Sequence, residues 1–182
     1  MWKKFLVIVL VAVAQANDDK KKFKVTLEKV DVEADPAFAT VTAAIRNENG
    51  GTVVDISGNI LQDIDSDVFV DIFVSTEGDP GEFKPLLKAE DIDFCAFDKN
   101  NTMAPLLDMF LKDINNYGSI PLKCPVKKGD IHLKGYNIAH ENLPSLTPEA
   151  RYLIESKIFV KMDGKDRHEI YHSKWIALIA KE

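Results

Sequence analysis

Two histidines near the end of the chain stand in the spacing of a zinc-binding motif. The stretch RHEIYH, from Arg167 to His172, contains the pattern H-E-x-x-H. In metalloproteases the two histidines of this pattern hold a zinc ion and the glutamate acts as a general base. That chemistry needs a helix, because side chains four residues apart share one helical face, about 6 Å from each other.

The surroundings of the motif favour a strand instead. A Met-Asp-Gly-Lys turn precedes it at 162–165, and a β-branched and aromatic run follows it at 175–179. Four residues of a strand span roughly 13 Å, too far for His168 and His172 to share a zinc ion. The sequence after His172 offers one acid as a third ligand, the terminal Glu182. We therefore interpret both histidines as partly exposed strand residues and expect no metal, no cofactor and no enzymatic activity.

The two cysteines, Cys95 and Cys124, are the next residues with chemistry of their own. In an oxidising compartment an isolated pair usually forms one disulfide, so we predict this bond rather than a thiol nucleophile. Asn100-Asn101-Thr102 is an N-glycosylation sequon, which makes Asn100 a candidate modification site.

The N-terminal residues are typical of a secretory signal peptide. Lys3 and Lys4 precede an apolar run at 5–14, and Ala14-Gln15-Ala16 fits a cleavage site. We predict a signal peptide at 1–16 and one exported, soluble domain at 17–182, of a length that fits a single core. The formal net charge of −6 argues against nucleic acid as a partner.

Most of the remaining sequence alternates between apolar and polar residues. The alternation includes Phe23, Val25 and Leu27, and turns are expected at Asp35-Pro36 and at 47–51. One segment differs, because its apolar residues follow a helical spacing. These residues are Met103, Leu106, Leu107, Phe110, Leu111 and Ile114. We predict an all-β fold of six to eight short strands in two antiparallel sheets, with one amphipathic helix between the cysteines.

The second half of the chain resembles a known family. The stretches DFCAFDKN, KCPVKKGDIHLKGYNI, ENLPSLTPEARYLIESKIFV and KWIALIA are similar to the myeloid-differentiation-2-related lipid-recognition (ML) domains, in particular the ganglioside activator. ISGNILQDIDSDVFVDIFV and FKPLLKAEDIDFC resemble a secreted arthropod branch of that family, some members of which are linked to chemosensory tissue. The resemblance runs from about Ile56 to the end. It departs from the activator in disulfide number, since Trp175 falls near the place of a late cysteine.

The resemblance implies an immunoglobulin-like sandwich whose sheets hold acyl chains between them, without catalysis. It implies a disulfide between Cys95 and Cys124 that flanks the helix, and a turn at 127–129 whose Lys127 and Lys128 are candidates for contact with an anionic head group. Candidate pocket residues, including a helical lid, are Val70, Ile72, Val74, Met103, Leu107, Phe110, Leu111, Tyr152, Ile154 and Ile158.

The expected partner is therefore a lipid or another hydrophobic small molecule, with a receptor or a hydrolase as a protein partner and transient contact with a membrane surface. We expect an extracellular monomer in the chemosensory version, and a lysosomal glycolipid activator in the other. The apolar alternation by itself favours a closed core, and only the resemblance to ML domains reverses that preference, so an extracellular interaction module without a pocket stays open as an alternative.

Overall fold

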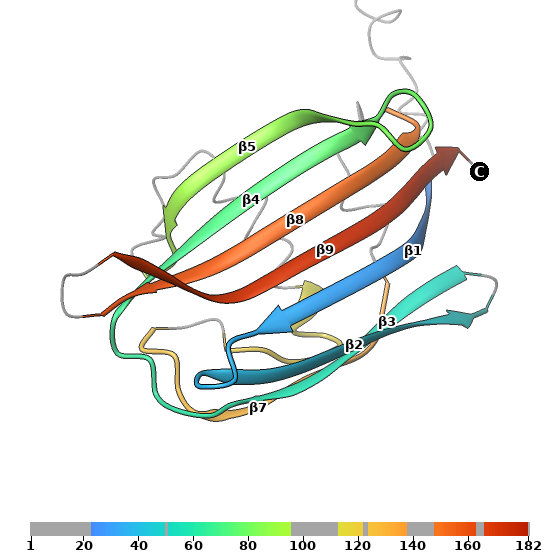
Figure 1. Ribbon diagram of the computed structural model, residues 1–182. Helices are drawn as coiled ribbons and strands as arrows, with labels where there is room; N and C mark the ends of the chain where they lie inside the picture. The colour runs from blue at the N-terminus through green and yellow to red at the C-terminus, as the bar shows by residue number, and fades with distance from the viewer. Residues whose placement is uncertain are drawn as a thin grey trace, which may run out of the picture.

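The computed structural model describes residues 23–49, 51–95, 113–121, 124–137, 148–162 and 166–181. They form two antiparallel sheets stacked as a sandwich (Figure 1). The first sheet has the strand order β1-β9-β8-β4-β5 and the second the order β2-β3-β7-β6. The strands are β1 (Phe23–Ala34), β2 (Ala39–Glu48), β3 (Gly51–Ile60), β4 (Asp67–Glu77), β5 (Phe83–Asp93), β6 (Gly118–Ser119), β7 (Gly129–Tyr136), β8 (Ala150–Lys161) and β9 (Arg167–Lys181). The prediction of an all-β, two-sheet sandwich is confirmed.

The strands form where apolar residues alternate with polar ones, because successive side chains of a strand point to opposite faces. In β1 the predicted face of Phe23, Val25 and Leu27 is buried, while Lys24 and Glu28 are exposed. The alternation makes one face of each strand apolar, and burial of that face against the other sheet stabilises the packing of the two layers.

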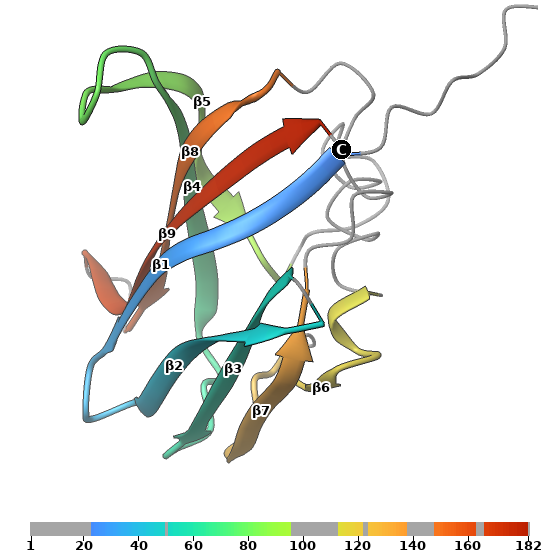
Figure 2. The same ribbon diagram turned by 90° about the vertical axis from the view of Figure 1, so that its right-hand side faces the viewer.

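The chain passes from the first sheet to the second at the predicted Asp-Pro turn. There the Asp35 side chain accepts a hydrogen bond from the Ala37 N–H at 2.8 Å, and its carbonyl accepts one from the Phe38 N–H at 2.9 Å. β1 and β2 lie close together at this turn and diverge away from it (Figures 1 and 2). The chain therefore joins the two sheets at this corner, and a buried hydrogen bond from the Leu27 N–H to the Thr52 hydroxyl, at 2.6 Å, joins β1 to β3 nearer the start of β1.

The buried core falls into two clusters at opposite ends of the strands. The first cluster gathers around the start of β1 and the end of β9, with Leu27, Val54 and Ala177 among its members. The second gathers around the end of β8 and the start of β4, with Val68 and Val160 among its members. The middle of the sandwich lies between these two clusters.

Cys95 and Cys124 form the predicted disulfide, with their Cα atoms 5.4 Å apart. Cys95 follows β5 of the first sheet and Cys124 precedes β7 of the second, so the bond ties the two sheets together. The described residues contain no helical element, and most of the helix predicted around 103–114 lies outside them. Asp113 and Ile114 are described as helical, a turn follows them at 115–117, and the Ile114 carbonyl accepts a hydrogen bond from the Tyr117 N–H.

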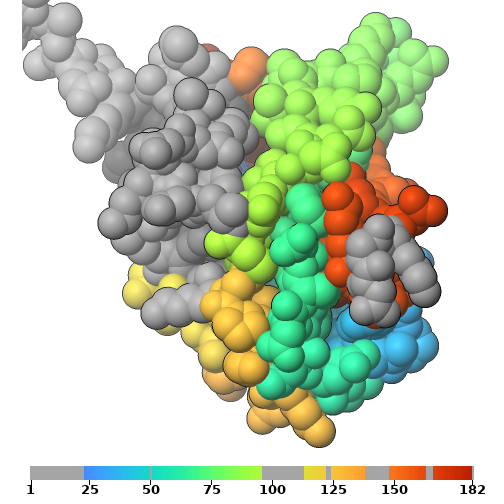
Figure 3. Space-filling model, turned by 90° about the vertical axis from the view of Figure 1, so that its left-hand side faces the viewer, coloured from blue at the N-terminus to red at the C-terminus, as the bar shows by residue number. Residues whose placement is uncertain are grey.

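The strand count exceeds the expected six to eight, partly because β5 escapes the simple alternation. β5 pairs with β4 alone, and its register shifts twice, between Val70 and Ile72 and between Val74 and Ser75 of the partner strand. It also contains Pro85, which has no N–H to donate and is tolerated at a sheet edge. Figure 3 shows β5, in yellow-green, on the surface at the rim of the sheet.

Candidate functional site

Three rows of side chains cross the inner face of the five-stranded sheet, and we call these fifteen positions the inner wall. Each row contains one residue from each strand, set opposite its neighbours by the register. The rows are Leu87, Val74, Ile154, Trp175 and Val30; then Ala89, Ile72, Ser156, Ser173 and Val32; then Ile92, Val70, Ile158, Tyr171 and Ala34. None of the fifteen side chains carries a charge at neutral pH.

Apart from Ser173, which is 1% exposed, the middle of the inner wall is less buried than the core on either side of it. On β8, Val160 is fully buried and Tyr152 is 5% exposed, whereas Ile154 and Ile158 between them are only partly buried. On β4, Val68 is 3% exposed and the following inward residues are again partly buried. In a closed sandwich the centre of the inner face should be the driest place, so this wall is incompletely covered by protein.

The register brings five of the predicted pocket residues into this wall. Val70 lies opposite Ile158, Val74 lies opposite Ile154, and Ile72 lies between the two pairs. Tyr152, the sixth described candidate, lies just beyond the wall in the first core cluster and donates its hydroxyl to the Pro148 carbonyl at 2.9 Å. The structure therefore places these candidates on the inward face of β4 and β8, as the alternation of the sequence predicted.

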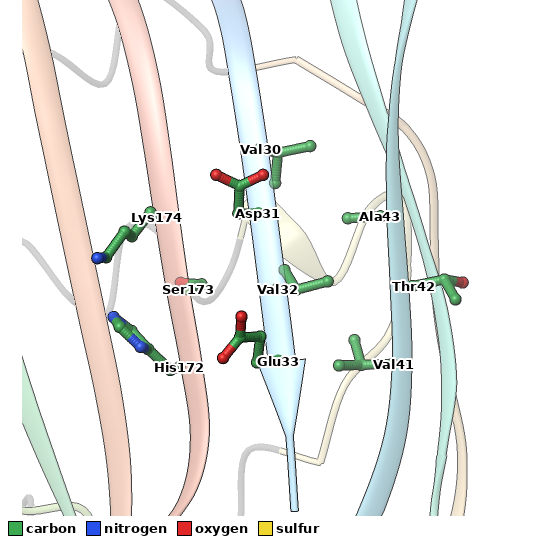
Figure 4. A pocket seen from close by; sticks show the side chains of 10 residues that line it. All are labelled: Val30, Asp31, Val32, Glu33, Val41, Thr42, Ala43, His172, Ser173 and Lys174. Carbon is green, nitrogen blue, oxygen red and sulfur yellow. The ribbon is translucent and has the colours of Figure 1, made fainter.

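A groove of about 580 Å³ opens along the corner where the two sheets meet. Val30 and Val32 of β1 point toward Val41 and Ala43 of β2 across it (Figure 4). Ser173 of β9 also lines the groove. The groove thus contacts the inner wall at one side and the second sheet at the other, and its volume suits a small ligand.

Asp31 and Glu33 point the opposite way from the groove valines (Figure 4). Lys174 and His172 complete the lining with polar atoms on that outward side. The groove therefore has an apolar inner side between the sheets and a charged outer side, an arrangement that suits an apolar ligand entering from water.

The second sheet supplies the opposing surface. Val41, Ala43 and Ile45 of β2 pack against the first core cluster together with Ile56 and Leu133 of the neighbouring strands. Gly58 lies opposite Val41 in the register and contributes no side chain. This surface is also uncharged at these positions, so both sides of the inter-sheet space are apolar.

The wall has one polar feature, a pair of serines at its centre. Ser156 and Ser173 lie directly opposite each other, and their hydroxyl oxygens are 2.8 Å apart. The Trp175 indole donates its N–H to the Ser173 hydroxyl at 2.9 Å. Burial raises the pKa of Tyr171, and a side-chain hydrogen bond with Ser173 offsets part of that rise. These four side chains form a hydroxyl cluster in otherwise apolar surroundings.

Of the two lysines predicted to meet a head group, Lys127 has its side chain paired with carboxylates. Lys127 Nζ lies 2.8 Å from an Asp63 carboxylate oxygen and 3.4 Å from one of Asp65, and this pairing raises the Lys127 pKa. The backbone N–H of Lys128 donates to the same Asp63 at 2.8 Å. An anionic head group would have to compete with two carboxylates for Lys127, so Lys127 is less suited to that role than the sequence indicated.

Several candidates lie outside the described residues. They are the predicted lid residues Met103, Leu107, Phe110 and Leu111, and the sequon residue Asn100. The predicted signal peptide at 1–16 lies outside them as well.

The H-E-x-x-H residues lie on a strand, β9, as predicted. A bulge near Ile170 then separates the histidines further, because His168 lies opposite Val160, an inward residue, and His172 lies opposite the outward Lys157. His168 pairs with Asp35 at 2.6 Å and His172 with Glu155 at 2.7 Å. Within the described ranges, no three His, Cys, Asp or Glu side chains are grouped closely enough to hold a metal ion.

Sequence reasoning missed the residues that only the pairing of strands reveals. Val30, Val32 and Trp175 lie on the wall, and Leu87 and Ala89 extend it onto β5, although neither feature was expected. A usable signal was present at Ser156 and Ser173, since each is a lone serine at an inward position of an apolar strand face. Such interruptions mark positions where an apolar face makes a polar contact.

Comparison with known families finds similarity in the middle of the chain. Residues 68–154 match the family model described as a protein of unknown function (DUF1091). The matched stretch is somewhat less than half of the sequence and runs from β4 to the start of β8. No curated protein matches the sequence. In the described part of the chain, no helix is long and apolar enough to cross a membrane.

Proposed function

We propose that the protein is a secreted carrier or presenter that binds a lipid or another apolar small molecule between its two sheets, without catalysis. The observation that carries the proposal is the inner wall, whose aliphatic centre is only partly buried while the core at both ends is closed. A ligand chain at this place would complete the burial that the protein itself leaves unfinished.

The energetics of such a site are favourable. Each CH₂ group removed from water contributes about 0.8 kcal/mol, so a chain of about ten carbons supplies roughly 8 kcal/mol before ordering costs. The apolar sides of the groove, Val30 and Val32 facing Val41 and Ala43, offer such a chain a route between the sheets. The charged outer lining keeps the mouth of the groove wetted.

The resemblance to ML domains supports the same reading, because those domains hold acyl chains between splayed sheets. On this proposal the fold is ML-type and immunoglobulin-like, the protein is an extracellular monomer, and it presents a hydrophobic signal in chemosensation. A glycolipid activator of a lysosomal hydrolase would use the same wall, with a different partner protein.

The first test is native mass spectrometry of the secreted protein, followed by organic extraction and identification of bound lipid. One lipid per chain is the expected result. A protein that carries no lipid and takes up no fluorescent fatty acid or glycolipid would favour the alternative of a closed interaction module.

The second test places the ligand. Ile154 lies on the inner wall and Ile176 on the outer face of the neighbouring strand, and both are partly buried. We expect Ile154→Asn to weaken uptake of an apolar fluorophore at least tenfold, because a buried amide lacks partners there. Ile176→Asn should leave uptake unchanged. Equal losses in the two variants would exclude the inner wall as the site.

A further inference from the structure

The hydroxyl cluster gives the inner wall a chemical preference beyond apolarity, and this inference rests on the proposed function. We infer that the wall binds ligands bearing one uncharged acceptor oxygen, a ketone, ester or ether, which receives a hydrogen bond from Ser156 or Tyr171.

Ser173 is the central residue of the cluster, and it is 1% exposed. Its oxygen already accepts the Trp175 N–H, and indole nitrogen can only donate. A buried hydroxyl proton needs an acceptor of its own. For Ser173 that acceptor is Ser156, at 2.8 Å, or the hydroxyl of Tyr171, whose pKa Ser173 lowers against the effect of burial.

Either choice leaves one hydroxyl proton without a partner inside the cluster. If Ser173 donates to Ser156, the Ser156 hydroxyl proton has no acceptor within the cluster. If Ser173 donates to Tyr171, then Ser156 donates to Ser173, and the Tyr171 hydroxyl proton has no acceptor within the cluster. Ser156 and Tyr171 are both partly exposed residues, whereas Ser173 is buried, so the spare donor is always on one of the two partly exposed residues.

The residues around this donor determine which kind of ligand oxygen can accept its hydrogen bond. The fifteen positions of the inner wall include no cation, so a buried carboxylate would lose its hydration without gaining a counter-ion. A neutral carbonyl or ether oxygen has a much smaller desolvation cost and two lone pairs to offer. The cluster lies in the middle row, with apolar residues on both sides, so the oxygen belongs within an apolar chain rather than at a charged end.

The test is competition against a bound apolar fluorophore, N-phenyl-1-naphthylamine, by decane, 2-decanone and decanoate at pH 7. The measured quantity is the affinity ratio of 2-decanone to decane, because it cancels general effects on chain burial. We expect Ser156→Ala/Tyr171→Phe to lower this ratio about tenfold, the usual worth of one good hydrogen bond. Each single variant should lower the affinity ratio less, because the remaining hydroxyl can still donate a hydrogen bond to the ligand. Decanoate should be the weaker oxygenated ligand.

The controls separate the two proposals. Ser75→Ala removes a hydroxyl from the outer face of β4 and should keep the wild-type ratio. Circular dichroism establishes that the double variant is folded. Binding of decane and 2-decanone with an unchanged ratio in the double variant, or tighter binding of decanoate, overturns this inference alone. Failure of all three compounds to displace the fluorophore overturns the proposed function with it.

Discussion

Arg167 shows how single residues keep charge on the outer face of the five-stranded sheet. Its guanidinium lies 3.9 Å from the centre of the Phe159 ring and 5.7 Å from that of Phe69. It donates to Asp71 at 2.8 Å and also pairs with Asp91. Asp71, 6% exposed, further accepts the Asp91 N–H at 2.9 Å, which holds the bulge of β5 in place. The cation is thus desolvated by rings and compensated by carboxylates.

This arrangement makes Asp71 more important for stability than surface carboxylates. We expect Asp71→Ala to lower the free energy of unfolding by about 3 kcal/mol, because it leaves a largely enclosed cation with one exposed partner and frees a backbone N–H. Urea unfolding followed by tryptophan fluorescence measures the loss. Asp31→Ala, which breaks an exposed pair with Lys29, is the control and should change little. Similar losses in both variants would show that the Arg167 cluster is energetically an ordinary surface pair.

Close approach of β2 and β3 illustrates a constraint at the scale of elements. Gly58 of β3 lies opposite Val41, and a Cβ atom at this position would be 2.0 Å from the Thr40 carbonyl oxygen. The neighbour is backbone within a paired strand, so it cannot move aside without loss of the pairing. The glycine is therefore a packing requirement of the second sheet, where it also leaves the inter-sheet space open opposite Val41.

The corresponding prediction compares two glycines. Gly58→Ala should lower the free energy of unfolding by about 2 kcal/mol, the usual cost of forcing a methyl group into a packed place. Gly129→Ala, at the start of β7, meets no atom within 4 Å and should have a small effect. Thermal or urea unfolding distinguishes them. A tolerated Gly58→Ala, with an unchanged midpoint, would mean that the strands separate at little cost.

In the whole molecule, two features have opposite effects on the separation of the sheets. The β1–β2 corner and the two core clusters hold the sheets together, while the divergence of the sheets leaves the inner wall partly uncovered. The disulfide contributes to the first of these, because it ties the end of β5 in one sheet to the segment before β7 in the other. It thereby limits how far the sheets can separate.

Removal of this bond tests that role. Cys95 and Cys124 are 29 residues apart, and closure of a loop of this size stabilises a fold by roughly 3–4 kcal/mol. We expect Cys95→Ser/Cys124→Ser to lose about that free energy of unfolding in urea. Chemical reduction of the wild-type protein should produce the same loss, which separates the effect of the bond from that of the serines. An unchanged unfolding midpoint in both cases would exclude the bond as a significant tie.

Local patterns were sufficient for part of this structure. The apolar alternation identified the buried faces of β1, β4 and β8, and turn residues marked the chain reversals at Asp35-Pro36 and 47–51. Edge strand β5 could not be predicted in this way, because its two register shifts and Pro85 disrupt the apolar–polar alternation that indicates a strand.

Three properties could be predicted from the residues alone: which side chains share a face, where strands end, and that H-E-x-x-H lies on a strand. Those properties depend on near neighbours along the chain. Folding was needed to show that a bulge sends His168 and His172 to opposite faces, and that Ser156 meets Ser173 at the centre of an apolar wall. Register and bulges arise from the fit between strands brought together by folding, and no single strand carries that information.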